Sequence, residues 1–250
     1  MKIQYLIENE KDWFNCFPPA GGATQWTDGH SAKEFAKIVT SENFEKSLGS
    51  ALNLIIEDIP INQAFPERLT YFDNNSRGPR HHDLACITKV NGTNKALCFE
   101  AKVKESPDKQ LKKYDSDFSE GQQERANNLC KLFFGKTYEE NKEELSKIYY
   151  QILTGLAGTI VFAAENNVSE CYFIIYQIIP QSSKNKPSER IIKKHKMAVT
   201  DFIDCYKGSA IKELWEENTM VADLGIIPMT LNGKIISSHA HIVYTEKECP

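Results

Sequence analysis

The sequence predicts a mixed α/β domain with a central mixed β-sheet flanked by helices. Two apolar segments, 84–90 and 95–104, are joined by a turn at Asn91-Gly92-Thr93-Asn94, which predicts a β-hairpin. A long helical pattern follows at 141–165, and residues 170–179 (ECYFIIYQII) form the most strongly apolar strand pattern in the chain. The order helix, strand, hairpin, long helix, strand is typical of a sheet covered by helices.

The first third of the chain mixes irregular and helical patterns. Residues 16–30 are rich in Pro and Gly and predict an irregular segment. Ser31 has the features of an N-cap, and Glu34 lies three residues further on, which together predict a capping box. A helix is therefore expected over 32–39, resuming over 42–48, and a short strand over 69–72. Residues 52–59 are apolar but too short to assign to either class.

The remaining elements alternate between helices and strands. Residues 105–118 are polar and predict a loop, and helices are expected over 119–134 and 141–165 with a Gly-Lys-Thr break between them. Pro180 ends the strand at 170–179. Further helices are expected over 188–206 and 209–217, and short strands over 226–244 around an Asn-Gly turn at 232–233.

At 250 residues the chain is long enough for one sizeable core. We expect residues 1–180 to form the core with an N-terminal extension. Residues 181–250 would then form a helical and strand elaboration packed on the same domain, with a basic run over 184–196. That run is either a nucleic-acid-binding surface or an ordinary solvated helix face.

The composition is that of an ordinary globular protein, with 41% hydrophobic and 26% charged residues. No apolar stretch is long enough for a signal sequence or a membrane span, so no membrane association is expected. The seven cysteines are odd in number and none form a CxxC pair, which argues against a disulfide framework and a zinc knuckle. We therefore expect a cytoplasmic protein with reduced thiols. The net charge of −4 does not by itself indicate a nucleic-acid partner.

Three charged residues lie at the open end of the predicted hairpin. If Gly92-Thr93 forms the tip of the turn, Asp83 lies opposite Lys102, with Glu100 diagonal to it. Glu100 and Lys102 are two residues apart and share a face. On that face Ala96 and Cys98 are small or apolar, which indicates that the face is partly covered, and buried charges call for a metal or a partner.

This arrangement suits a divalent metal. Two carboxylates a few ångströms apart repel each other unless a cation lies between them, and oxygen ligands favour Mg²⁺. The backbone carbonyl of Ala101 can add a ligand, and Lys102 can stabilise negative charge beside the metal.

The sequence His82-Asp83, followed by Glu100-Ala101-Lys102, resembles the PD-(D/E)XK signature of restriction-endonuclease-like nucleases. His82 stands where that family often has Pro. The order of elements over about 30–180 is also similar to the family core, and the segment GGATQWTDGHSAKEFA resembles the opening of an uncharacterised bacterial branch of putative restriction endonucleases.

The resemblance implies a restriction-endonuclease-like core and a nuclease that hydrolyses phosphodiester bonds in DNA with Mg²⁺, for which Mn²⁺ can substitute. It would serve in restriction or phage defence, and a homodimer would suit cleavage of both strands. Asp83 and Glu100 would be metal ligands and catalytic residues together with Lys102, and Ala101 would add its carbonyl. The family also implies an acidic residue on the first helix, here Glu34, and a Gln on the later helix, here Gln151. Phosphate contacts are expected from Arg77, Arg80 and Lys104.

Other interpretations stay open for these residues. The charged cluster can be a cross-strand ion pair, or His81 and His82 can form a zinc site with Asp83. Gln151 can be the edge of a core helix that Gly155 and Gly158 bring close to the sheet. His239 and His241 alternate along a predicted strand, where solvent-facing side chains are expected. For the whole chain the alternatives are a DNA-binding or regulatory protein that keeps the fold without catalysis, and a metal-dependent phosphoesterase acting on another substrate.

Overall fold

The computed structural model describes residues 7–19, 21–41, 44, 61–74, 78–90, 92–207, 212–216 and 218–249. Within this described part of the chain, the helices before the sheet are α1 (Glu10–Cys16) and α2 (Ser31–Val39), with a 3-10 turn between them. The strands are β1 (Ile61–Thr70), β2 (Arg80–Val90), β3 (Thr93–Lys102), β4 (Glu170–Pro180), β5 (Lys212–Glu216), β6 (Thr219–Leu231) and β7 (Lys234–Cys249). The other helices are α4 (Tyr114–Asp117), α5 (Glu120–Phe134), α6 (Lys142–Leu145), α7 (Tyr150–Glu165) and α8 (Glu189–Cys205).

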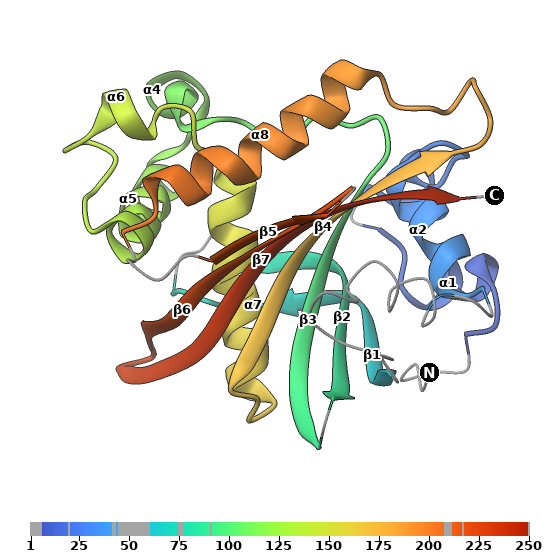
Figure 1. Cartoon of the computed structure of the whole chain (residues 1–250), viewed down its shortest axis with the longest axis horizontal. Helices are drawn as coiled ribbons and strands as arrows, with labels where there is room; N and C mark the ends of the chain where they lie inside the picture. Colours follow the sequence, from blue (N-terminus) through green and yellow to red (C-terminus); the bar gives the residue numbers. More distant parts are fainter. Residues whose placement is uncertain are drawn as a thin grey trace.

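One seven-stranded sheet organises the molecule, in the order β1-β2-β3-β4-β7-β6-β5 (Figure 1). Strand β4 is parallel to both β3 and β7, and the other neighbours are antiparallel. The parallel step from β3 to β4 needs a crossover, which contains α5 and α7. The prediction of a mixed sheet flanked by helices is confirmed.

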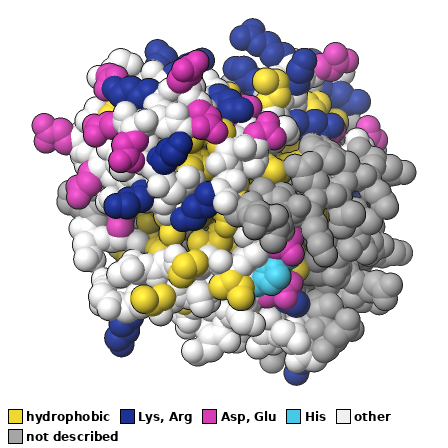
Figure 2. Space-filling view, turned by 60° about the vertical axis from the view of Figure 1, so that its left-hand side comes forward, with side chains coloured by type: hydrophobic (Ala, Val, Ile, Leu, Met, Phe, Trp, Pro, Cys, Tyr) yellow, Lys and Arg dark blue, Asp and Glu magenta, His cyan; other side chains and the backbone are white. Residues whose placement is uncertain are grey.

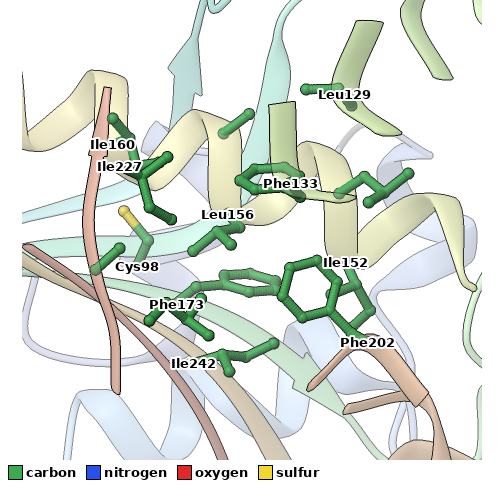
Figure 3. Close-up of a cluster of buried hydrophobic side chains, with 14 of the residues drawn as sticks. Cys98, Leu129, Phe133, Ile152, Leu156, Ile160, Phe173, Phe202, Ile227 and Ile242 are labelled. Atoms are coloured by element: carbon green, nitrogen blue, oxygen red, sulfur yellow. The ribbon is translucent and has the colours of Figure 1, made fainter. Parts of the chain in front are cut away.

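Helix α7 packs against one face of the sheet and is apolar around most of its circumference. Its buried residues run almost without interruption from Tyr150 to Ala163, as expected for a helix enclosed by other elements. Gly155 permits the close approach, because a Cβ atom there would lie 2.2 Å from the ring of Phe173. Figure 3 shows this core, in which side chains of the sheet meet those of α5, α7 and α8: Cys98, Phe173, Ile242, Phe133, Leu156 and Phe202.

The N-terminal helices cover the opposite face of the sheet. Helix α2 buries Phe35, Ala36 and Val39 on one side, the spacing of an amphipathic helix. The ring of Phe35 packs 5.7 Å from that of Phe99 on β3 and 5.6 Å from that of Tyr176 on β4, measured between centroids. The sheet therefore has two buried faces. No helix among the described residues is both long and apolar enough to span a bilayer.

Several predicted boundaries were wrong. The strand expected at 69–72 is the end of a longer one, because β1 begins at Ile61 and ends at Thr70. The helix expected at 141–165 is divided, since the backbone between α6 and α7 bonds to the preceding loop, from Leu111 N–H to the Ile148 carbonyl (2.8 Å) and from Tyr150 N–H to the Lys109 carbonyl (3.1 Å).

The C-terminal region also differs from its prediction. Within the helix expected at 209–217, the described residues Lys212–Glu216 form strand β5, which pairs with β6, so tertiary pairing overrides local helix propensity there. The turn at Asn232-Gly233 joins β6 and β7, which are longer than expected. Residues 181–250 thus add three strands to the same sheet, with β7 between β4 and β6. The predicted helix 42–48 and the segment 52–59 lie outside the described residues, apart from Phe44.

Candidate active site

The predicted register of the hairpin was wrong by two positions. Val90 pairs with Thr93, and the pairing continues to Leu84 opposite Phe99. Only positions 91 and 92 lie between the strands, and Gly92 takes a left-handed conformation (φ 82°) that suits a two-residue turn. Continued by one residue, this register places Asp83 opposite Glu100 instead of Lys102. Because side chains alternate with a period of two, the correction leaves every residue on its predicted face.

Four of the predicted side chains meet at the open end of this hairpin. The Nζ atom of Lys102 lies 2.6 Å from Oε1 of Glu100, and the Gln151 side-chain amide donates to the same oxygen at 2.7 Å. The carboxylate of Asp83 accepts a hydrogen bond from the backbone N–H of Ala101 at 2.6 Å. Glu100 and Lys102 are only 6% and 8% exposed, so the predicted covering of this face is observed.

Arg80 is a fifth member of the cluster. Its guanidinium pairs with the second carboxylate oxygen of Glu100, and its side chain is 12% exposed. From the sequence, Arg80 was expected to contact phosphate; in the structure it begins β2, and its side chain points at Glu100. The carboxylate of Glu100 thus has three partners: Arg80, Lys102 and Gln151.

Glu67 is an acidic member of this site that the sequence analysis did not find. Pro66 pairs with Leu84 and Arg68 with His82, so Glu67 lies beside Asp83 on the neighbouring strand. Its backbone has a positive φ of 49°, which is unusual for a residue other than glycine. Its carboxylate lies 3.2 Å from Nδ1 of His81. A charged residue just after a proline within β1 was the available signal, and it was missed because the strand was predicted to start at Leu69.

The structure does not bring Glu34 into the cluster. Its carboxylate accepts from the backbone N–H of Gly29 at 2.8 Å and from Lys37 at 3.2 Å. The predicted capping box is also absent, because the N-cap of α2 is His30. Instead, Glu105 binds the start of this helix, accepting the Ser31 N–H at 2.8 Å.

Of the other two basic residues predicted to contact phosphate, the structure describes only Lys104. Arg77 lies outside the described residues, and Lys104 donates to the Lys184 carbonyl at 2.6 Å and to Asn185 at 3.0 Å. On the face drawn in Figure 2, Lys and Arg side chains are interspersed with Asp and Glu. In the predicted basic run, Lys196 pairs with Glu246 at 2.5 Å.

The buried carboxylates of the site differ in the direction of their pKa shifts. Burial raises the pKa of Asp83 well above its usual value, and the negative charges of Glu100 and Glu67 add to the effect. Burial likewise raises the pKa of Glu67. For Glu100 burial acts in the same direction, but Arg80 and Lys102 outweigh it, so the pKa of Glu100 is lowered.

Lys102 remains a cation in this environment. Burial acts to lower the pKa of Lys102, but the carboxylates of Glu100 and Asp83 outweigh it and raise that pKa. His82 behaves in the opposite way, since burial and the charge of Arg80 hold the pKa of His82 well below its usual value. Its Nε2 atom lies 3.1 Å from the Thr70 hydroxyl, so the structure does not support a zinc site of His81, His82 and Asp83.

A cavity of about 290 Å³ opens onto the cluster. It lies where β1, β2 and β3 approach the start of α2, and charged and polar residues form most of its wall. The lining residues are Pro19, Gln25, His30, Ser31, Ala32, Glu67, Arg80, His81, Asp83, Glu100, Lys102 and Glu105. Four carboxylates, those of Glu67, Asp83, Glu100 and Glu105, therefore face a common space with Lys102 and Arg80.

The fold and this site define a mixed α/β domain with a buried acidic and basic cluster at one end of its sheet. The chain belongs to the family described as a domain of unknown function, DUF6946, which it matches over residues 6–211. That match includes Glu67, Asp83, Glu100, Lys102 and Gln151 and ends before β6 and β7. No curated protein and no solved structure gives a significant match.

Proposed function

We propose that this protein is a metal-dependent nuclease that hydrolyses phosphodiester bonds in DNA at the hairpin cluster. The observation that carries the proposal is the convergence of Asp83, Glu100 and Lys102 on one cavity, with Gln151 bonded to Glu100. These are the residues that the PD-(D/E)XK resemblance selects from the sequence, and they come from three separate segments of the chain. A cross-strand ion pair alone would not require Gln151 from a distant helix.

The residues present fit a divalent cation. Glu67, Asp83 and Glu100 place three carboxylates around the same cavity, and their mutual repulsion contributes to the raised pKa of Asp83. A bound Mg²⁺ relieves such repulsion, and carboxylate and carbonyl oxygens are its preferred ligands. Asp83, Glu100 and the Ala101 carbonyl would hold the metal, with Glu67 in the supporting role that the sequence assigned to Glu34. Mn²⁺ would substitute, because it accepts the same ligands.

When bound, the metal supplies an activated water and a positive charge beside the scissile phosphate. Lys102 acts as a fixed cation rather than as a base, because its raised pKa keeps it protonated. It stabilises the negative charge that develops on the phosphate oxygens. Gln151 is a positioning residue that holds the Glu100 carboxylate through its side-chain amide.

Arg80 sets a condition on metal binding. Its guanidinium pairs with the Glu100 oxygen that Lys102 and Gln151 leave available. Arg80 must turn away before Glu100 can bind a cation through this oxygen, after which it is free to contact a phosphate, as the sequence predicted. In this proposal Arg80 first controls metal binding to Glu100 and afterwards contacts the phosphate.

The substrate, the biological role, the domain limits, the oligomeric state and the location of the protein belong to the same proposal. DNA as the substrate and a role in restriction or phage defence rest on the family resemblance, as does a restriction-endonuclease-like core over residues 1–180 with an elaboration over 181–250. A homodimer would supply two active sites for the two strands of a duplex. A cytoplasmic location is consistent with cysteines that are scattered along the sequence, odd in number and without a CxxC pair.

A second candidate is a DNA-binding or regulatory protein that keeps this fold without catalysis. One observation favours it: Arg80, Lys102 and Gln151 already satisfy the Glu100 carboxylate. In such a protein the cluster would be a structural ion-pair network with no metal affinity.

Cleavage of supercoiled plasmid DNA separates the two candidates. The wild type is expected to nick or linearise the plasmid with Mg²⁺ or Mn²⁺ and to be inactive with EDTA. Lys102→Ala should reduce the rate by about 10²-fold or more. Lys89→Ala is the matched control, because Lys89 lies exposed on the same hairpin, and it should cleave like the wild type. Equal rates for the two variants would exclude catalysis at this cluster.

A further inference from the structure

A second cluster of metal-ligating side chains lies on three neighbouring strands, β4, β7 and β6 (Figure 1). Asp223 on β6 pairs with His241 on β7, and Glu170 on β4 pairs with His239. From the sequence, both histidines were expected to face solvent. The structure corrects this for His241, which is only 8% exposed, whereas the His239 side chain is 41% exposed.

The three side chains of Asp223, His239 and His241 are close enough to share one ion. One ligand atom from each lies within 4.8 Å of the others, and Nε2 of His239 lies 2.7 Å from Oδ1 of Asp223. The two imidazole rings stack with centroids 4.8 Å apart and planes inclined by 10°. The ring of Tyr172 stacks on His241 at 4.3 Å, which fixes the orientation of this buried ring.

A β-bulge places the carboxylate. The register between β6 and β7 shifts between Asp223 and Ile226, and Gly225 takes a positive φ of 69° within that shift. The Gly225 N–H donates to Oδ1 of Asp223 at 2.7 Å, which holds the carboxylate toward His239. Bulges commonly redirect side chains at functional sites.

His241 has an unsatisfied nitrogen. Its Nε2 atom is buried and has no hydrogen-bond partner among the described residues. Oε1 of Glu170 lies 3.4 Å away, which makes a long ion pair only when His241 is protonated, and the same carboxylate binds Lys95 and the Tyr172 hydroxyl. An imidazole nitrogen that is buried without a partner is costly, and a metal ion would satisfy it.

We propose that Asp223, His239 and His241 form a Zn²⁺ site. Two imidazoles and one carboxylate are a ligand set that zinc adopts, and three protein ligands leave one coordination position open. Glu170 and His239 line a cavity of about 300 Å³, together with Ser169, Ile226, Ser237 and Ser238, into which the open position can face. On binding, the metal replaces the proton between His239 and Asp223.

This site is separate from the hairpin cluster. Glu100 pairs with Ile175 on β4, five residues from Glu170, which corresponds to about 16 Å along the strand. Ile175 packs in the core under α7 and Tyr172 in the core under α2, so the two sites also lie toward opposite faces of the sheet. A zinc ion at Asp223 is therefore not the metal of the proposed nuclease reaction.

Competition with a chromophoric chelator tests the proposal on the full chain, with Zn²⁺ as the only added metal. The wild type should bind one equivalent at this site, and His239→Ala and Asp223→Asn should each weaken that binding by at least about tenfold. Asp83→Asn is the matched control for zinc at the hairpin cluster and should leave the affinity unchanged. Co²⁺ in place of Zn²⁺ should give visible absorption bands that disappear in His239→Ala.

Three outcomes overturn the proposal. The first is a wild type that binds no zinc, and the second is an unchanged affinity in His239→Ala and Asp223→Asn. Because His239 is partly exposed, its substitution should leave the fold intact, which circular dichroism of the same samples checks. Loss of zinc binding in Asp83→Asn alone would place the ion in the hairpin cavity and would also overturn it.

Discussion

At the scale of single residues, the site is defined by how Asp83 and Glu100 differ. Both are carboxylates at the end of one hairpin, yet the pKa of Asp83 is raised and that of Glu100 is lowered. The difference arises because Arg80 and Lys102 contact Glu100, whereas Asp83 receives mainly a backbone N–H. Asp83 is therefore the carboxylate whose charge a metal would stabilise most.

The raised pKa of Asp83 predicts a pH dependence of stability. The folded state holds the Asp83 proton more tightly than the unfolded state, so the free energy of unfolding should fall as the pH rises from the usual aspartate value through the raised one. Asp83→Asn should remove this component and stabilise the metal-free protein at neutral pH by at least about 1 kcal/mol. Urea denaturation of both proteins at several pH values without metal measures it. A variant that is less stable than the wild type at neutral pH would contradict the expected sign.

Arg80 offers a second prediction at this scale. Arg80→Gln should strengthen Mg²⁺ binding roughly tenfold, because it frees one oxygen of Glu100 and removes a competing positive charge. It should also lower the free energy of unfolding without metal by about 3 kcal/mol, since it leaves a buried carboxylate with one cation fewer. Isothermal titration and urea denaturation measure the two effects. Weaker Mg²⁺ binding in Arg80→Gln would instead make Arg80 part of the metal-bound state.

At the scale of elements, α7 connects the core to the site. Gly155 lets the helix approach Phe173, and Gly158 faces Thr70, His82 and Arg80. This close approach places Gln151, one turn earlier, against Glu100. The close approach of this helix to the sheet was predicted from the spacing of Gln151, Gly155 and Gly158, because the three positions share one helix face.

Gly155→Ala should therefore damage both packing and the site. Its Cβ atom would lie 2.2 Å from the Phe173 ring, so the helix must shift, and we expect a loss of about 1–3 kcal/mol in the free energy of unfolding. Plasmid cleavage should fall as Gln151 moves away from Glu100. Glu124→Ala, an exposed position on α5, is the control and should change neither quantity. If thermal melts show that Gly155→Ala is as stable as the wild type, the helix does not need a glycine at position 155.

The sequence predicted the elements better than their boundaries. The hairpin, α5 and β4 follow from apolar patterns and an Asn-Gly turn that act locally. The split between α6 and α7 and the strand β5 were missed because backbone bonds to distant segments decide them. Within the site, Glu100 and Lys102 were predicted from their spacing, and Gln151 from the family resemblance. Glu67 was missed, and Arg80 was expected only to contact phosphate, because their places depend on strand register.

At the scale of the whole molecule, the C-terminal region completes the sheet. Every residue of β4 from Glu170 to Pro180 pairs with β7, and β7 lies outside the family match that ends at residue 211. Without β7, the central strand β4 would become an exposed, strongly apolar edge, which promotes aggregation. The two proposed metal sites both depend on this one sheet, at its two ends.

A chain truncated after residue 211 should therefore fail to fold. We expect it to be insoluble or to lack a cooperative thermal transition, because it loses β5, β6 and β7 together. Circular dichroism and size-exclusion chromatography of the truncated and full chains provide the comparison. A truncated chain with a cooperative transition would show that residues 1–211 form an independent core.

The central claim is that the acids of the hairpin cavity support metal-dependent DNA cleavage. Its most direct test is the rate of plasmid cleavage with Mg²⁺ by the wild type, Asp83→Asn and Glu34→Gln. Glu34 is the matched control, because the family resemblance assigned this acidic residue to the metal site, whereas in the structure it does not line the cavity. We predict cleavage by the wild type and Glu34→Gln and none by Asp83→Asn. Equal rates in all three proteins, or no cleavage by the wild type, would contradict the claim.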